Sequence, residues 1–165
     1  MSRDDQFREF ALAQTPRLLR GAWLLCGEHQ LAEDLTQETL AKVYLAWGKR
    51  GIDNAGAYAH TTMVRTFISA RRKRSSSEQP AAIIADRSAS DGDSDLRLDL
   101  MTALAALSPV DRAVLVLRFL EDQPVSRAAE ALGLSELAVR SRTQRALQQV
   151  RLHLGSRSDY LEGGL

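Results

Sequence analysis

The side chains best suited to binding a partner lie on a predicted helix that begins after Ser135. One face of this helix carries arginine, serine and glutamine side chains, which can donate hydrogen bonds to guanine, adenine or phosphate in a major groove. These side chains are Arg140, Ser141, Gln144, Arg145 and Gln148, with Arg142 at the edge of the face. The opposite face is apolar, because Val139, Ala146 and Val150 recur at helical spacing. The pattern predicts a helix that packs by one face and contacts DNA by the other.

Residues 125–145 also have the spacing of a helix-turn-helix. Ala129 is small enough for two helices to approach each other, Gly133 permits the turn, and Val139 locks the second helix. Ser135 suits the N-cap of the second helix, and we include it among the DNA-contacting residues. The alternative is a helical hairpin with a solvated basic face. The agreement between the turn spacing and the chemistry of the face favours DNA binding.

A second group of cations ends another predicted helix. It comprises Arg65, Arg71, Arg72, Lys73 and Arg74, and no acidic residue lies between residues 65 and 74. Such a run provides electrostatic attraction for phosphates. The alternative interpretation is an exposed helix end whose positive charges complement the helix dipole.

A third surface is acidic. On the helix predicted for residues 31–47, a polar stripe lies opposite the apolar set of Leu35, Thr39, Val43 and Trp47. The polar stripe consists of Asp34, Gln37, Glu38 and Ala41. By itself, this pattern is also that of an ordinary solvated helix face.

The elements that must position these residues are all helical. Apolar residues recur at helical spacing across most of the 165 residues, with a break near Gly27, and no long run alternates as a strand would. We therefore predict an all-α fold of two small domains, with the helix-turn-helix in the second. The predicted parts are residues 1–74, a flexible acidic linker over 75–98, a domain over 99–155, and a flexible tail over 156–165. Lys and Arg number 22 against 21 Asp and Glu, so net charge gives no sign of a polyanionic partner.

Several other kinds of chemistry are not expected. The three histidines and the single cysteine have no metal-ligand spacing, so we predict no metal site and no cofactor. Cys26 is expected to be a core thiol, with a redox sensor as the less favoured alternative. No phosphate-binding glycine loop or acid/base constellation is present, which argues against an enzyme. The lone cysteine, the lack of a long apolar run and the polar N-terminus predict a cytoplasmic chain without membrane insertion or an export signal.

Two segments carry a resemblance to a known family. Residues 32–39, 42–44 and 46–47 resemble the core-binding segment of bacterial RNA polymerase sigma factors, particularly the extracytoplasmic-function (ECF) group. Residues 107–115 and 139–142 are similar to the promoter-binding C-terminal domain of that family. Together the two matches cover nearly the whole chain except the linker.

The resemblance implies a partner for each surface. It implies that the acidic stripe docks on the coiled coil of the β′ clamp of core RNA polymerase, that the β flap is a further contact, and that an anti-sigma factor regulates the chain. It assigns reading of the −35 promoter element to the helix-turn-helix, and reading and melting of the −10 element to the first domain. Candidates near the loop that precedes the cationic helix are Asn54, Tyr58, His60, Thr61 and Thr62, in addition to the cations. Base capture in a melted strand needs such a pocket together with cations.

Two rival functions remain at this stage. One is a stand-alone helix-turn-helix regulator that binds duplex DNA as a dimer. The other is an interaction protein that sequesters polymerase or a regulator without reading promoters.

Overall fold

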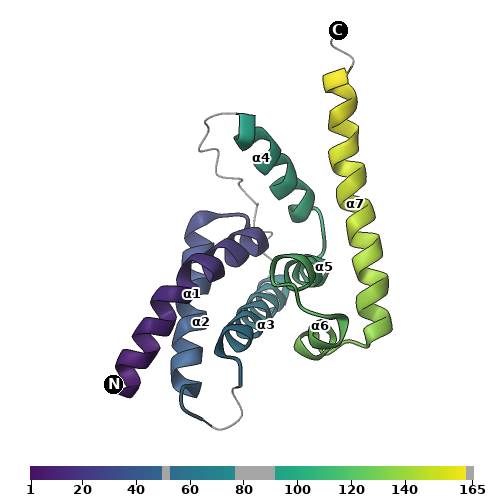
Figure 1. Cartoon of the computed structure of the whole chain (residues 1–165). Helices are drawn as coiled ribbons and strands as arrows, with labels where there is room; N and C mark the ends of the chain where they lie inside the picture. Colours follow the sequence, from purple (N-terminus) through teal and green to yellow (C-terminus); the bar gives the residue numbers. More distant parts are fainter. Residues whose placement is uncertain (50–52, 77–91, 163–165) are drawn as a thin grey trace. The chain divides into compact units, whose positions relative to one another are not determined.

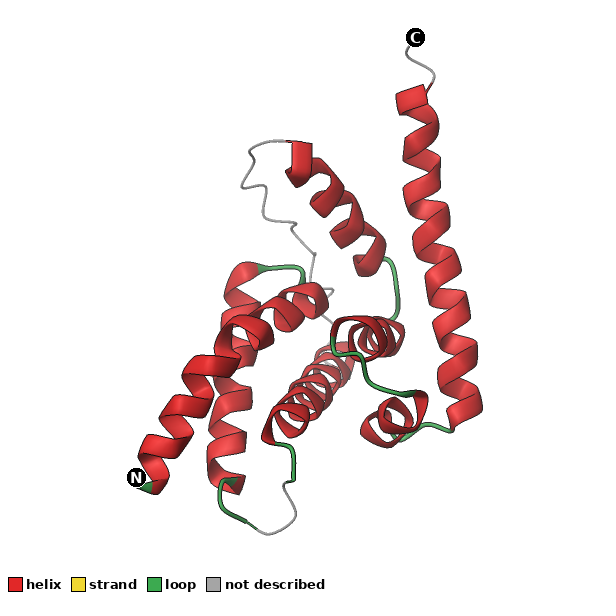
Figure 2. Cartoon of the chain, in the orientation of Figure 1, coloured by secondary structure: helices red, strands yellow, loops and turns green. Residues whose placement is uncertain are grey.

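The structure, a computed structural model, describes residues 1–49, 53–76 and 92–162. Within these ranges every regular element is helical and no strand occurs, which confirms the all-α prediction (Figure 2). Contacts divide the chain into two compact units, Met1–Ala82 and Ile83–Leu165. None of the described helices is both long and apolar enough to cross a membrane.

The first unit is a three-helix assembly of α1 (Arg3–Cys26), α2 (His29–Ala46) and α3 (Ala55–Ser76), in which each helix contacts the other two (Figure 1). Helix α1 begins with a capping box between Ser2 and Asp5 and ends at Gly27, whose φ of 73° is left-handed and confirms the predicted break. The core contains the fully buried Leu18, Leu25, Val43, Met63 and Val64. Cys26 is buried beside them, as expected of a core thiol.

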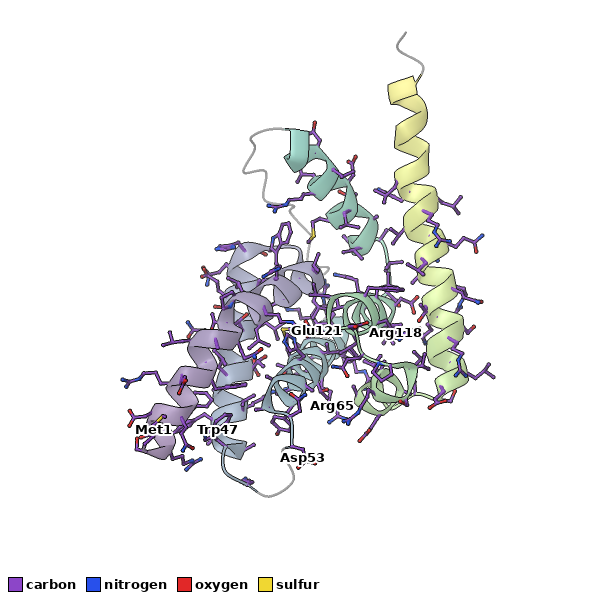
Figure 3. All side chains as sticks on the ribbon, viewed as in Figure 1. Met1, Trp47, Asp53, Arg65, Arg118 and Glu121 are labelled. Atoms are coloured by element: carbon purple, nitrogen blue, oxygen red, sulfur yellow. The ribbon has the colours of Figure 1, made fainter. Side chains whose placement is uncertain are left out.

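Contacts between aromatic rings pack the start of α1 against the end of α2. Trp47, labelled in Figure 3, lies 5.4 Å from Phe7 and 4.9 Å from Phe10 between ring centroids. Tyr44 adds an edge-on contact with Phe7 at 5.0 Å, and its hydroxyl donates to Asp4 at 2.9 Å. Trp47 is half-buried and has the packing role that its place on the apolar face predicts.

The second unit contains α4 (Gly92–Ala105), α5 (Pro109–Leu115), a π-helical turn η1 (Val116–Leu120), α6 (Val125–Leu132) and α7 (Glu136–Glu162). Ser108 caps α5 by accepting from the Asp111 amide at 3.2 Å, and Pro109 occupies the first turn. Helix α7 contacts α4, α5 and α6, so it is the element against which the other helices pack. The core includes Leu107, Val114, Leu117, Val139 and Ala146.

The structure corrects both ends of the predicted linker. Helix α3 continues through Ser76, and α4 begins at Gly92, so helices occupy parts of residues 75–98. Two of the acidic residues of this segment, Asp93 and Asp95, fall in the first turn of α4, where negative charge complements the helix dipole. The rest of the predicted linker, residues 77–91, lies outside the described residues.

The predicted tail is also corrected. Helix α7 continues through Glu162, although we expected a flexible segment from residue 156. Neither proline nor glycine occurs between Ser156 and Glu162, so nothing in this stretch breaks the helix. The remaining tail residues, 163–165, lie outside the described residues.

Candidate nucleic-acid interface

The turn between α6 and α7 has the geometry that the sequence pattern predicts. Gly133 ends α6 with a left-handed φ of 64°, and the Leu134 amide donates to the Ala129 carbonyl at 3.0 Å in a Schellman-type cap. Ala129 and Val139 are buried at the helix contact. Ser135 then caps α7, since its hydroxyl accepts from the Ala138 amide at 3.0 Å. These contacts define a helix-turn-helix, with α7 as its second helix.

The outward face of α7 is polar and cationic. Arg140, Ser141, Gln144, Arg145 and Gln148 are all exposed, whereas Val139, Ala146 and Val150 are buried on the other side. Arg140 is 3.8 Å from Glu136 across exposed side chains, a contact weak enough to leave the guanidinium available to a partner. Ser135 is exposed, but its hydroxyl is engaged in the cap, so its role in this structure is to start α7.

Arg142 departs from the predicted DNA-contacting set. Its Nη1 lies 2.8 Å from Asp111 Oδ1, and the side chains are 32% and 14% exposed respectively. The pair joins α7 to the first turn of α5. Arg142 is therefore engaged within the domain and holds the second helix of the helix-turn-helix in place.

We expect Arg142→Met to lower the free energy of unfolding of the second unit by about 1–2 kcal/mol, because Asp111 loses its charged partner in a part-buried site. Far-UV circular dichroism during urea unfolding measures this change. Both tryptophans, Trp23 and Trp47, lie in the first unit, so the tryptophan fluorescence transition should stay unchanged.

The matched control is Arg140→Met, which removes the same group from the exposed 3.8 Å pair and should change stability by less than about 0.5 kcal/mol. Equal destabilisation by the two variants would contradict a structural role for the Arg142–Asp111 pair.

The loop-side candidates occupy the start of α3. Asn54 Oδ1 accepts from the Ala57 amide at 3.0 Å, so this side chain caps the helix. Tyr58 is 37% exposed, while Thr61 and Thr62 are half-buried. Thr61 and Thr62 lie three and four residues after Tyr58, and Arg65 lies four and three residues after them, so the four share one face of α3.

His60 is the clearest error among the predicted residues. It is 3% exposed and lies on the inward face of α3 with Met63, Val64 and Phe67. Burial lowers the pKa of His60 from 6.5 to about 4, and the charge of Arg17 lowers it further in the same direction. A neutral buried imidazole cannot contact DNA from this position. His60 lies three, four and seven residues before Met63, Val64 and Phe67, and this helical spacing by itself predicts that His60 is buried with them.

The cations of α3 divide between two faces. Arg65, which Figure 3 labels on α3, is exposed with Arg72 and Lys73. Arg71 is half-buried, with its guanidinium carbon 5.6 Å from the centre of the Phe67 ring. Arg71 and Arg74 line a pocket of about 160 Å³ between α3 and α2, which also includes Asp34 and Glu38. The structure therefore brings these two cations beside the acidic stripe.

The acidic stripe lies on the outward face of α2. Asp34, Gln37, Glu38 and Ala41 are exposed, and Leu35, Thr39 and Val43 are buried opposite them. The Gln30 side-chain Nε2 donates to Asp34 Oδ1 at 3.0 Å. Leu45, 69% exposed, continues the stripe by a further turn and was not among the predicted residues.

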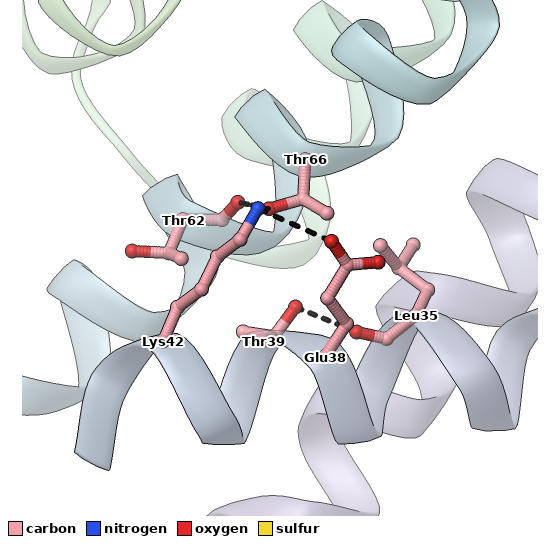
Figure 4. A network of polar contacts seen from close by, with 6 residues as sticks. All are labelled: Leu35, Glu38, Thr39, Lys42, Thr62 and Thr66. Atoms are coloured by element: carbon pink, nitrogen blue, oxygen red, sulfur yellow. Dashed lines mark hydrogen bonds and ion pairs between the residues drawn. The ribbon is translucent and has the colours of Figure 1, made fainter. Parts of the chain in front are cut away.

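Glu38 is linked to α3 through Lys42. The Lys42 Nζ atom lies 3.3 Å from Glu38 Oε1 and donates to Thr66 Oγ1 at 3.0 Å (Figure 4). The Thr66 hydroxyl in turn donates to the Thr62 carbonyl at 2.7 Å. One ammonium group thus contacts the acidic stripe of α2 and the helix that carries the cations.

Comparisons with known proteins agree with this two-part site. The models of sigma-70 region 2 and sigma-70 region 4 match residues 12–77 and 97–150. An RNA polymerase sigma-E factor from Streptomyces avermitilis is 34% identical over 157 residues, covering 92% of this chain and 87% of the relative. The chain therefore belongs to the sigma-70 family of RNA polymerase sigma factors.

Within that family, the chain is of the ECF type, as the resemblance of residues 32–39, 42–44 and 46–47 implies. The ECF sigma factor SigE of Mycolicibacterium smegmatis is 30% identical, with coverage of 91% of this chain and 62% of the relative. A solved structure of the sigma factor RpoE in complex with the anti-sigma factor NepR, from Bartonella quintana, matches with a TM-score of 0.73 and 26% identity, covering 91% of this chain and 97% of that one.

Proposed function

We propose that this chain binds core RNA polymerase and directs it to promoters, acting through binding and not through catalysis. The observation that carries the proposal is that each unit matches a sigma region and presents an outward face with the chemistry that its role requires. A chain that binds bacterial RNA polymerase works in the cytoplasm, so the proposal includes this location.

The acidic stripe of α2 is the polymerase-contacting surface in this proposal. Asp34 and Glu38 are exposed carboxylates that can pair with arginines of the β′ clamp, and Gln37 can add hydrogen bonds. Ala41 lies next along the stripe after Glu38, where its small side chain leaves room for a partner side chain. The β flap is the second polymerase contact, made by the other unit.

The DNA-contacting surfaces are the outward faces of α3 and α7. On α3, Tyr58, Thr61, Thr62 and Arg65 face the −10 element, with Arg72 and Lys73 available for phosphates. On α7, Arg140, Ser141, Gln144 and Arg145 read the −35 element in the major groove. His60 is buried in the first unit and Arg142 pairs with Asp111 in the second, so neither is included among the DNA contacts.

An anti-sigma factor is the proposed regulator. The solved RpoE structure contains the anti-sigma factor NepR. A protein that covers the pocket between α2 and α3 would also cover Asp34 and Glu38 and so prevent polymerase docking.

Run-off transcription with purified core polymerase tests the proposal. The wild-type chain should give defined transcripts from selected promoters, and Asp34→Ala/Glu38→Ala should weaken binding to core polymerase by about tenfold or more, because two charged hydrogen-bond acceptors are lost. Glu9→Ala, which removes an exposed acid from α1, should leave binding unchanged. Absence of transcripts together with tight binding of the free protein to a palindromic duplex would instead indicate a stand-alone regulator.

A further inference from the structure

Leu137 is an exposed apolar side chain in the middle of a polar face. It lies in the first turn of α7 and is 75% exposed. Ser141 and Gln144 follow it by four and seven residues and share its face, and all three lie opposite the buried Val139. Neither the packing of the unit nor the cap at Ser135 explains a leucine at this position.

The surroundings of Leu137 indicate what kind of group it meets. Arg140 and Arg145 are exposed on either side of Leu137, and Glu136 lies 3.8 Å from Arg140, so the face has a net positive charge that favours a negatively charged partner. Leucine offers neither a donor nor an acceptor, so it contributes only apolar contact. In the major groove, the apolar group that base pairs present is the C5-methyl of thymine. The first residues of the second helix in a helix-turn-helix are those that approach base edges.

We propose that Leu137 contacts the C5-methyl group of a thymine in the −35 element and so helps to determine which promoters this sigma factor reads. The proposal rests on the proposed function, because it requires that α7 bind promoter DNA. It adds an apolar specificity contact to the hydrogen-bonding residues of the same face. Arg140 and Arg145 supply attraction to the duplex, and Leu137 discriminates thymine from the other bases at one position.

Deoxyuridine substitution isolates this contact, because it removes only the methyl group from thymine. A promoter is first selected from a random library by wild-type holoenzyme, and each thymine of its −35 element is then replaced in turn. At one position, deoxyuridine should weaken binding of wild-type holoenzyme by about fourfold, the effect of one buried methyl group. Holoenzyme with Leu137→Ala should bind the thymine and deoxyuridine duplexes equally.

Leu152→Ala is the matched control. Leu152 is 67% exposed and lies on the same helix beyond the proposed base contacts, so this variant should keep the wild-type response to deoxyuridine. The side chain of Leu137 is too exposed for its truncation to disturb the core, so the variant tests contact with DNA and not folding.

Three results would overturn the proposal. One is a selected −35 element without thymine, and another is an unchanged deoxyuridine response in Leu137→Ala. The third is weaker binding of Leu137→Ala to core polymerase in the absence of DNA, which would assign the residue to a protein contact. Failure of the proposed function looks different, because wild-type protein would then yield no promoter-bound holoenzyme at all.

Discussion

Arg140→Ala/Arg145→Ala should lose about 2–6 kcal/mol of promoter-binding free energy, since a good base contact contributes about 1–3 kcal/mol. Both guanidinium groups project from the outward face of α7, and the Arg140–Glu136 pair at 3.8 Å restrains only one of them weakly. Holoenzyme affinity for the selected promoter, measured by fluorescence anisotropy at fixed salt concentration, checks the result.

The control for this prediction has the same change in charge. Arg8→Ala/Arg20→Ala removes two exposed arginines from α1 and should leave promoter affinity within about twofold of the wild type. If the α7 variant lost affinity equally for the promoter and for random DNA, the two arginines would be phosphate contacts and not readers of sequence.

Acid should destabilise the first unit through His60. The pKa of His60 in the folded chain is about 4, below its ordinary value of 6.5, so the unfolded chain binds the extra proton more readily. Stability from this source is fully present above about pH 6.5 and decreases as the pH falls towards 4. The full loss is about 3 kcal/mol, because each pKa unit corresponds to about 1.4 kcal/mol.

Urea unfolding followed by tryptophan fluorescence between pH 8 and pH 4 measures this loss, because Trp23 and Trp47 both lie in the first unit. His60→Gln should flatten the pH dependence, whatever its effect on stability at pH 8. His29→Gln is the control, since His29 is exposed beside Glu33 and should keep the wild-type slope. An equal decline in His60→Gln and wild type would show that other groups cause the acid sensitivity.

The sequence predicted those features that depend on neighbours along the chain. The Ala129, Gly133 and Val139 spacing specified the helix-turn-helix, and a period of 3.6 residues separated the buried and exposed faces of α2 and α7. The same rule applied to α3 excludes His60 from the surface. Proximity in sequence to the loop before α3 favours a DNA contact for His60, but its position on the helix decides that it is buried.

Other features depend on residues that are distant in the sequence. Arg142 lies on the edge of the predicted face, and only the packing of α7 against α5 brings it to Asp111, 31 residues earlier. The division of the α3 cations between two faces likewise follows from the position of α2. The sequence places Leu137 on the polar face of α7, but the chemistry of hydrogen-bond donors alone does not single out an apolar side chain.

The Lys42 ammonium group couples the electrostatics of two helices in the first unit, because it contacts both Glu38 on α2 and Thr66 on α3. It lies 3.3 Å from Glu38 Oε1 and 3.0 Å from Thr66 Oγ1, so a cation that pairs with this oxygen of Glu38 competes with Lys42. When an external cation displaces Lys42 from Glu38, the Lys42 ammonium group remains beside α3 without its acidic partner. The two helices therefore do not offer independent surfaces: through Lys42, a cation bound at Glu38 on α2 changes the electrostatic potential beside Thr66 on α3.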